Sequence, residues 1–455
     1  MSGSSAWVCD HGATATGSRS DSRAGPRPAP AGALRRLNAP APGLAVAPGW
    51  RTPLVVIVAG CLIATIGFGA RSSLGLFLEP LTAARGFSRE TFGLALAIQN
   101  LFWGLGLPVA GALADRHGAA RVIVAGAVVY ALGLWGMAWT ASGTGLHLFA
   151  GALAGLGIAF SAFSLALAAM VRVVGPERRT FVLGLGTAAG SAGQVLFSPL
   201  ALGLIEGLGW ERALHGLALA VLAMIPLALL LPRSPSGELA AVAGAASSPA
   251  EQSLSEALAE ALGHRGFVLL TTGFFVCGFH VAFITVHFPA YVADLGLPAS
   301  VGAASLALIG LANIVGSFAA GWAGQRFSKR HGLAAIYALR AVAILALLSA
   351  PKTAATVYAF ATVMGLLWLS TVPLTTGLIA QVFGVRFMAT LFGLVFLSHQ
   401  IGSFLGVWLG GVLYDRTGSY DGMWWAGVAL GIVAALVHLP IDERPLAREA
   451  SPAAG

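Results

Sequence analysis

Twelve long apolar segments follow one another along this chain of 455 residues, and they constrain the fold more than any other feature. A helix that crosses a bilayer needs about 20 mostly apolar residues. We therefore predict an all-α membrane protein with twelve transmembrane helices. The segments lie near 54–80, 91–112, 121–140, 145–172, 180–205 and 213–231, and then near 266–292, 300–322, 331–350, 354–381, 387–413 and 422–440.

The charge content agrees with lipid as the main solvent. Charged residues make up 10% of the chain, whereas a soluble domain has about 25%. The net charge of +8 does not indicate nucleic acid, because the basic residues lie in short loops between the apolar segments, where they report membrane orientation. We expect the lipid bilayer as a partner and no nucleic acid.

Polar stretches divide the chain into five parts. The first is rich in Ala, Gly, Pro, Ser and Arg and has no apolar periodicity, which predicts disorder. No apolar run precedes Leu54, so we expect no signal peptide. The expected parts are a cytoplasmic N-terminal tail over 1–50, a six-helix bundle over 51–232, a cytoplasmic central loop over 233–265, a second six-helix bundle over 266–440 and a cytoplasmic tail over 441–455.

The basic residues also predict orientation. With the N-terminus inside, the inner loops and the C-terminal tail carry thirteen Lys and Arg, whereas the outer loops carry five. Because cytoplasmic loops are enriched in basic residues, we expect a multi-pass protein of the cell inner (plasma) membrane with both termini in the cytoplasm.

The two halves of the chain are related at a nearly constant offset. One glycine-containing pattern ends both the second and the eighth segment. Another runs through both the fifth and the eleventh segment. Such internal repeats are common in transporters, which hold substrate where the halves meet. The matched pairs are Gly111 with Gly321, 210 residues apart, and Gly184 with Gly393 and Gly193 with Gly402, each 209 apart.

Motifs of covalent chemistry do not occur in this sequence. The three cysteines cannot form a disulfide framework. There is no Cys/His cluster at metal spacing, no Gly-rich phosphate loop and no Gly-x-Ser-x-Gly elbow. We expect no enzyme, no catalytic residue, no cofactor and no metal, so that transport would draw on an ion or substrate gradient.

The loop between the second and third segments resembles a signature of the major facilitator superfamily. It reads Gly111-x-Leu-Ala-Asp115-Arg116-x-Gly118-x-x-Arg121. The resemblance implies two six-helix bundles and an inner-side charge network, carried by Asp115, Arg116 and Arg121, that latches one conformation. In the second copy Gln325 stands where the acid would be, so an equivalent latch there is in doubt.

Further patterns resemble the monocarboxylate and oxalate–formate branch of that superfamily. They are Gly67-Phe-Gly-Ala-Arg-Ser-Ser-Leu-Gly-Leu-Phe-Leu-Glu-Pro80, followed by Gly86-Phe-Ser-Arg89. This resemblance implies an organic anion as substrate and a positively charged side chain near the position that Arg71 occupies. Proton symporters of the branch carry an acid and an arginine in helix 8, but the stretch 313–317 is neutral here, so that pair is not carried over.

Ionisable residues inside apolar segments are costly, about 2.5–3.5 kcal/mol on insertion scales, and they are candidates for function. Arg71 is a candidate anion ligand; the alternative is an arginine that snorkels to the outer interface. His280 is its mate at the 209-residue offset and could bind an anion or a proton; the alternative is a neutral histidine bonded between helices. Arg340, on a helix that is peripheral in this family, is expected to be structural.

Neutral polar and aromatic residues complete the predicted substrate site. For the polar ones an interhelical hydrogen bond is the alternative role, and for tryptophans it is packing. The candidates are Gln99, Asn100, Gln194, Trp368, His399 and Gln400, with Trp103 as a further possible lining residue.

The function that these features favour is secondary transport of a small organic anion, a mono- or dicarboxylate, by alternating access. Proton symport and anion exchange both stay open, and we expect a monomer. One alternative is an efflux antiporter for drugs or other amphiphiles. Another is a non-transporting receptor on the same fold.

Overall fold

The computed structural model describes residues 52–174, 176–232, 253–384 and 387–446. Over these residues the chain is helical without strands, and twelve spans are long and apolar enough to cross a membrane. The predicted all-α fold with twelve transmembrane helices in two repeats is therefore confirmed. The expected disorder of the N-terminal tail and most of the predicted central loop lie outside the described residues.

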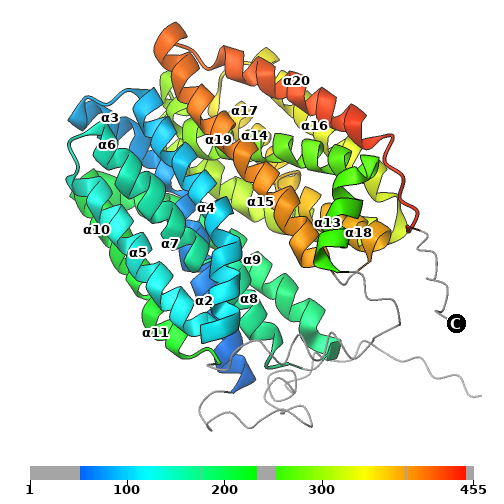
Figure 1. Cartoon of the computed structure of the whole chain (residues 1–455). Helices are drawn as coiled ribbons and strands as arrows, with labels where there is room; N and C mark the ends of the chain where they lie inside the picture. Colours follow the sequence, from blue (N-terminus) through cyan, green and yellow to red (C-terminus); the bar gives the residue numbers. More distant parts are fainter. Residues whose placement is uncertain (1–51, 175, 233–252, 385–386, 447–455) are drawn as a thin grey trace, which may run out of the picture. The chain divides into compact units, whose positions relative to one another are not determined.

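The first half of the chain supplies six of the twelve spans, several of them built from more than one helical element (Figure 1). Its elements are α2 (Pro53–Ser72), η1 (Leu74–Phe77), α3 (Leu78–Arg85), α4 (Arg89–His117), α5 (Ala119–Trp139), α6 (Gly143–Leu146), the π-helical η2 (His147–Leu153), α7 (Ala154–Phe160), α8 (Phe163–Val171), α9 (Pro176–Leu208), α10 (Trp210–Leu222) and α11 (Met224–Leu229).

The second half supplies the other six spans. Its elements are α13 (Leu254–Gly263), α14 (Arg265–Asp294), α15 (Ala299–Arg326), α16 (Lys329–Ser349), α17 (Ala354–Leu366), α18 (Thr371–Phe383), α19 (Met388–Thr417) and α20 (Asp421–His438).

Helices form here because backbone groups in lipid must be hydrogen-bonded within their own segment. Many of the helices begin at a hydroxyl residue whose side chain accepts a free N–H of the first turn. These caps are Thr52, Ser88, Ser142, Ser253, Ser328 and Thr353. Large apolar side chains such as Trp135, Leu219 and Leu311 are exposed, as expected of a surface that faces lipid.

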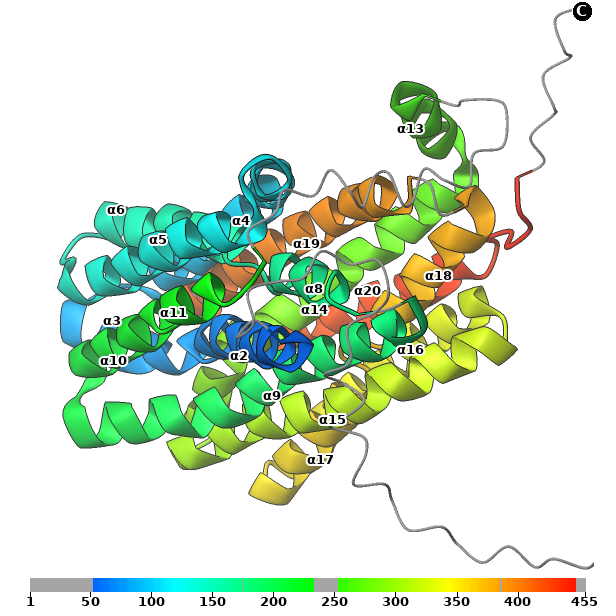
Figure 2. The same cartoon turned by 90° about the horizontal axis from the view of Figure 1, so that it is seen from below.

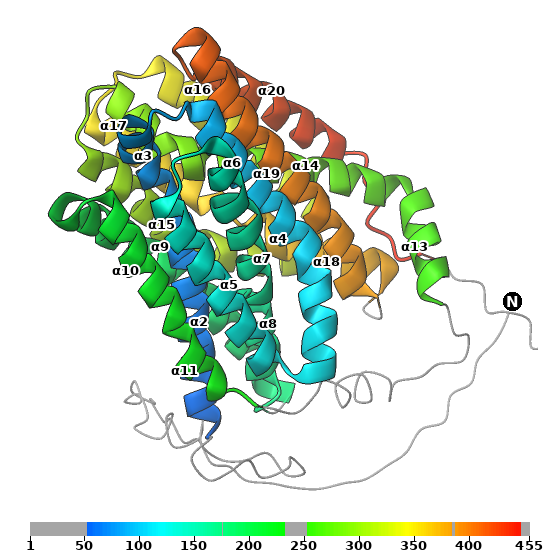
Figure 3. The same ribbon diagram turned by 60° about the vertical axis from the view of Figure 1, so that its left-hand side comes forward.

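Contacts between several elements join the two halves. α4 packs against α19, α9 against α15, and both η1 and α3 against α14. Figures 1 and 3 show α4 beside α19, and Figure 2 shows α9 beside α15. Within the second half, α14 and α19 approach closely at Gly278, where a β-carbon would overlap the carbonyl oxygen of His399.

Two spans are interrupted at positions related by the repeat. α7 ends at Phe160 and α8 begins at Phe163, whereas α17 ends at Leu366 and α18 begins at Thr371. Ser161 in the first break and Ser370 in the second are 209 residues apart, the same offset that relates Gly193 to Gly402. Interrupted helices free backbone groups inside the bundle, and transporters place binding sites at such points.

The part of the predicted central loop that is described contains a helix. α13 begins at Ser253, whose hydroxyl accepts from the N–H of Glu256 while the Glu256 carboxylate accepts from the N–H of Ser253. This reciprocal pair is a capping box. The Ser-x-x-Glu spacing could have signalled the helix from the sequence. Figure 2 shows α13 standing at the end of α14.

Candidate functional site

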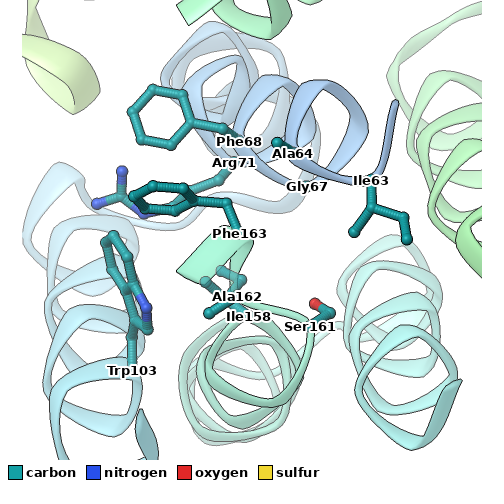
Figure 4. Close-up of a pocket in the computed structure, with 10 residues that line it drawn as sticks. All are labelled: Ile63, Ala64, Gly67, Phe68, Arg71, Trp103, Ile158, Ser161, Ala162 and Phe163. Carbon is teal, nitrogen blue, oxygen red and sulfur yellow. The ribbon is translucent and has the colours of Figure 1, made fainter. Parts of the chain in front are cut away.

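A small pocket inside the first half contains the guanidinium of Arg71. Its wall comes from α2, α4 and the broken span α7–α8, and includes Phe68, Trp103, Ser161 and Phe163. Figure 4 shows the Arg71 side chain beside the rings of Trp103 and Phe163, with Ser161 and Ala162 of the α7–α8 break among the other lining residues. The guanidinium carbon lies 4.5 Å from the centre of the Trp103 ring, a cation–π contact.

The hydrogen-bond donors of Arg71 are only partly paired with protein acceptors. Its Nη2 donates to Asn100 Oδ1 at 2.6 Å, but its Nε, although buried, has no hydrogen-bond partner in the structure. Trp103 Nε1 is also buried without a partner. No described carboxylate forms an ion pair with Arg71. Two donors, one from α2 and one from α4, therefore lack an acceptor at this pocket.

A chain of hydrogen bonds runs from Arg71 into the second half. Asn100 Nδ2 donates to the Leu96 carbonyl, which fixes the amide so that its oxygen faces Arg71. Gln400 Nε2 donates to the Asn100 carbonyl at 3.0 Å, and Gln400 Oε1 lies 3.0 Å from His399 Nδ1. Four of the predicted site residues, Arg71, Asn100, His399 and Gln400, thus lie together at the junction of α2, α4 and α19.

The other predicted site residues do not join this group. Gln99 donates to the Ala150 carbonyl at 2.8 Å within the first half. His280 Nε2 lies 2.8 Å from the Gly427 carbonyl of α20, and it does not line the Arg71 pocket. Trp368 is 1% exposed.

Gln194 lies apart from that pocket, at the contact between α9 and α15. A β-carbon at Gly310 would lie 3.0 Å from Gln194 Cβ. Both polar atoms of the Gln194 amide are buried without a hydrogen-bond partner in the structure. The residue therefore stands where the two halves pack together.

Arg340 stabilises the interruption of the tenth span. It is 0% exposed, and its Nη2 donates to the carbonyls of Leu367 and Trp368, while Nε donates to that of Leu367 at 3.2 Å. These carbonyls follow the end of α17, where the helix dipole is negative. On the other side of the break, Asn313 Oδ1 accepts from the N–H of Leu369 at 3.0 Å.

A network of ion pairs and hydrogen bonds joins the halves at one end of the bundle. The sequence analysis does not predict it. Arg89 at the start of α4 donates through Nη1 and Nη2 to the two carboxylate oxygens of Asp294, at 2.7 Å each, and through Nη1 to the Tyr420 hydroxyl at 3.0 Å. Asp415 of α19 accepts from the N–H groups of Arg89 and Glu90 at 3.1 and 2.7 Å. A carboxylate of one half thus caps a helix of the other.

At the opposite ends of α4 and α19 the glycines of the repeat have free space around them. A β-carbon at Gly111 of α4 or at Gly393 of α19 would meet no atom within 4 Å among the described residues. The contacts that tie α4 to the second half at the Arg89 end therefore have no counterpart at these two positions.

The backbone conformation at the end of α4 explains why the Gly111 motif has a glycine at position 118. Gly118 has φ 86° and ψ 141°, a conformation that residues with a β-carbon disfavour. Arg116 and Arg121 are exposed, and the side chain of Asp115 lies outside the described part of the chain. The latch role of Asp115, Arg116 and Arg121 stays a prediction.

Twelve membrane helices in two repeats, meeting around buried polar groups, define a transporter fold. The family model of the Major Facilitator Superfamily matches residues 60–322 and 303–454, so this chain belongs to the major facilitator superfamily. The predicted family is therefore confirmed.

Relatives and solved structures agree with this family. Monocarboxylate transporter 11 of Mus musculus is 29% identical over 388 residues, 82% of this chain and 83% of that protein. The uncharacterized MFS-type transporter YcxA of Bacillus subtilis is 23% identical over 77% of this chain and 85% of its own. In structure, a bacterial homolog of the human lysosomal transporter Spinster, in an inward-facing and occupied conformation, matches with a TM-score of 0.66 at 16% identity, over 84% of this chain and 95% of that one.

Proposed function

We propose that this protein is a secondary transporter that moves a small organic anion, a mono- or dicarboxylate, by alternating access. The observation that carries the proposal is Arg71, a cation in a pocket with no carboxylate partner among the described residues and with two donors that lack an acceptor. A guanidinium grips a carboxylate with two parallel hydrogen bonds. The resemblance to monocarboxylate transporter 11 supports the same substrate class.

The membrane orientation that we propose follows from the basic loops. With thirteen basic residues on the inner side and five on the outer, both termini lie in the cytoplasm of a cell whose inner (plasma) membrane holds the protein. In this orientation the Arg89 network lies at the outer side and joins the halves there, and the Gly111 motif lies at the inner side.

The test is uptake of a panel of labelled organic acids into proteoliposomes, with and without a pH gradient. We expect wild-type protein to take up at least one mono- or dicarboxylate, Arg71→Ala to abolish uptake, and Arg71→Lys to keep part of it because the charge remains. Arg212→Ala removes an exposed arginine at the start of α10 and should leave uptake unchanged. Wild-type uptake by a well-folded Arg71→Ala variant would overturn the role of Arg71.

A second candidate is efflux of an amphiphile, and one observation favours it. The rings of Phe68, Trp103 and Phe163 line the same pocket as Arg71, so the site has a large apolar surface. Under this reading, an amphiphilic dye should be transported and Arg71→Ala should retain that transport. Binding of an organic acid without flux of any compound would instead indicate a receptor.

A further inference from the structure

The contact between α9 and α15, which joins the two halves, contains a buried amide whose polar atoms are unpaired. Gln194 is 1% exposed, and neither its Oε1 nor its Nε2 is hydrogen-bonded to a described residue. A side-chain amide offers two N–H donors and one carbonyl acceptor. Packing α9 against α15 around this group removes the amide from water without giving it a partner, which makes the packed contact less favourable.

A second amide on the same contact is paired at both of its polar atoms. Asn313 of α15 donates through Nδ2 to the Ser191 hydroxyl of α9 at 2.8 Å, and its Oδ1 accepts from the N–H of Leu369 at 3.0 Å. Asn313 is as deeply buried as Gln194, at 1% exposed. The contact can therefore satisfy a buried amide, and the unpaired state of Gln194 is particular to that position.

The packing of the Gln194 side chain depends on the glycine that faces it. A β-carbon at Gly310 of α15 would lie 3.0 Å from Gln194 Cβ, 3.2 Å from Gln194 Cγ and 2.9 Å from the Ser191 carbonyl oxygen. The first two carbons of the Gln194 side chain thus fill the space over Gly310. An unbranched apolar side chain such as that of methionine has the same two carbons, so a substitution to methionine keeps this contact and changes the polar end of the side chain.

We propose that Gln194 is a conformational device whose unpaired amide weakens the packed α9–α15 contact, so that the two halves can separate there during transport. Alternating access moves one half against the other, and contacts between the halves must form and break in each cycle. A group that is hydrated when the helices are apart and unpaired when they are packed shifts the equilibrium toward separation. An apolar side chain of the same shape removes this effect.

Thermal unfolding of the full-length protein in detergent tests the sign of the effect without any substrate. Most substitutions of buried residues lower stability, but Gln194→Met should raise the unfolding midpoint by at least about 2 °C. The matched control is Asn313→Leu, which takes away the partner of Ser191 and Leu369 and should lower the midpoint. A Gln194→Met variant no more stable than wild type would overturn the proposal.

Distances between spin labels test whether the α9–α15 contact is the part that changes. With the native cysteines replaced by alanine, labels are placed at the exposed positions Glu206 of α9 and Ser300 of α15, which lie on the same side of the contact because the two helices run antiparallel. Gln194→Met should raise the ratio of short to long distances at least about fivefold. Gly310→Ala should lower it, because the new β-carbon pushes the helices apart. A shift of Gln194→Met toward long distances, or none, contradicts the proposal.

The kinetic consequence rests on the proposed transport function. For the organic acid that wild-type protein takes up fastest in the panel, Gln194→Met should lower the maximal rate several-fold and leave the apparent substrate constant unchanged, because separation of the halves becomes harder. A raised substrate constant at an unchanged rate would instead make Gln194 a substrate ligand and refute its conformational role. If wild-type protein takes up no organic acid, the proposed function fails, whereas unfolding and spin-label distances still decide the role of Gln194.

Discussion

Arg89 and Asp294 form a bidentate ion pair that joins the first helix bundle to the second, with both N–O distances at 2.7 Å. The two side chains are 14% and 28% exposed, so solvent screens the pair less than a fully exposed one. The guanidinium carbon of Arg89 lies 3.7 Å from the centre of the Tyr414 ring. This contact region is the main charged connection between the halves at the predicted outer side.

Asp294→Asn should shift the protein toward an outward-open state. The substitution removes one charge of the pair, at a cost of about 1 kcal/mol, which corresponds to a change of about fivefold in the population ratio. Spin labels at the exposed positions Ala84 and Ser300 should report a longer distance in the variant. Asp442→Asn is the control, because Asp442 pairs with Arg444 within one segment. An unchanged distance distribution would show that the pair does not hold the outer side closed.

Gln400→Ala should weaken substrate binding more than Gln99→Ala. Gln400 donates across the halves to Asn100, the residue that orients Arg71, whereas Gln99 donates to Ala150 within the first half. A lost hydrogen bond of about 1 kcal/mol predicts a several-fold rise in the apparent substrate constant for Gln400→Ala. Concentration-dependent uptake measures it, and equal effects of both substitutions would argue against the Asn100–Gln400 link.

Gly118→Ala should destabilise the protein, whereas Gly111→Ala should not. Gly118 has φ 86°, and a side chain in this conformation costs about 1–3 kcal/mol. Gly111 is helical and has open space around a β-carbon, so alanine there fits the state described. Thermal unfolding in detergent compares the two. A Gly118→Ala variant as stable as wild type would remove the backbone explanation for this position of the motif.

The orientation is tested by labelling single cysteines from outside with an impermeant reagent. Ser142 precedes α6 at the predicted outer side and Ser255 lies in α13 at the predicted inner side, and both are exposed. We expect a cysteine at position 142 to be labelled in intact cells and one at position 255 only after permeabilisation. The reverse pattern would invert the topology.

The sequence was sufficient for the spans and the family, because hydropathy over about 20 residues reflects the thickness of the bilayer directly. It was not sufficient for the direction in which a buried side chain points. The sequence predicts His280 as a substrate ligand and as the mate of Arg71, but it does not show that the ring contacts the Gly427 carbonyl of α20; the ligand role stays a prediction. Lipid and the bundle interior are both apolar, so the pattern of apolar residues around a membrane helix does not distinguish its faces.

The break in the tenth span was also missed, and for a different reason. The break is flanked by Gly365 and Pro373, which are local signals of an interruption. Such signals do not decide the matter, because Pro108 and Pro289 lie inside continuous helices. The groups that satisfy the freed backbone there, Arg340 and Asn313, lie on other helices. Only the folded arrangement brings these partners together.

The matching breaks at Ser161 and Ser370 also bear on the history of the molecule. A 209-residue offset shared by the breaks and by the packing glycines is what duplication of a six-helix unit with an interrupted fourth helix would produce. An arginine from another helix lies near each break, Arg71 from the first helix of one half and Arg340 from the third helix of the other. The two halves thus share one backbone irregularity and differ in the cation that accompanies it, because one arginine lines a pocket and the other is enclosed.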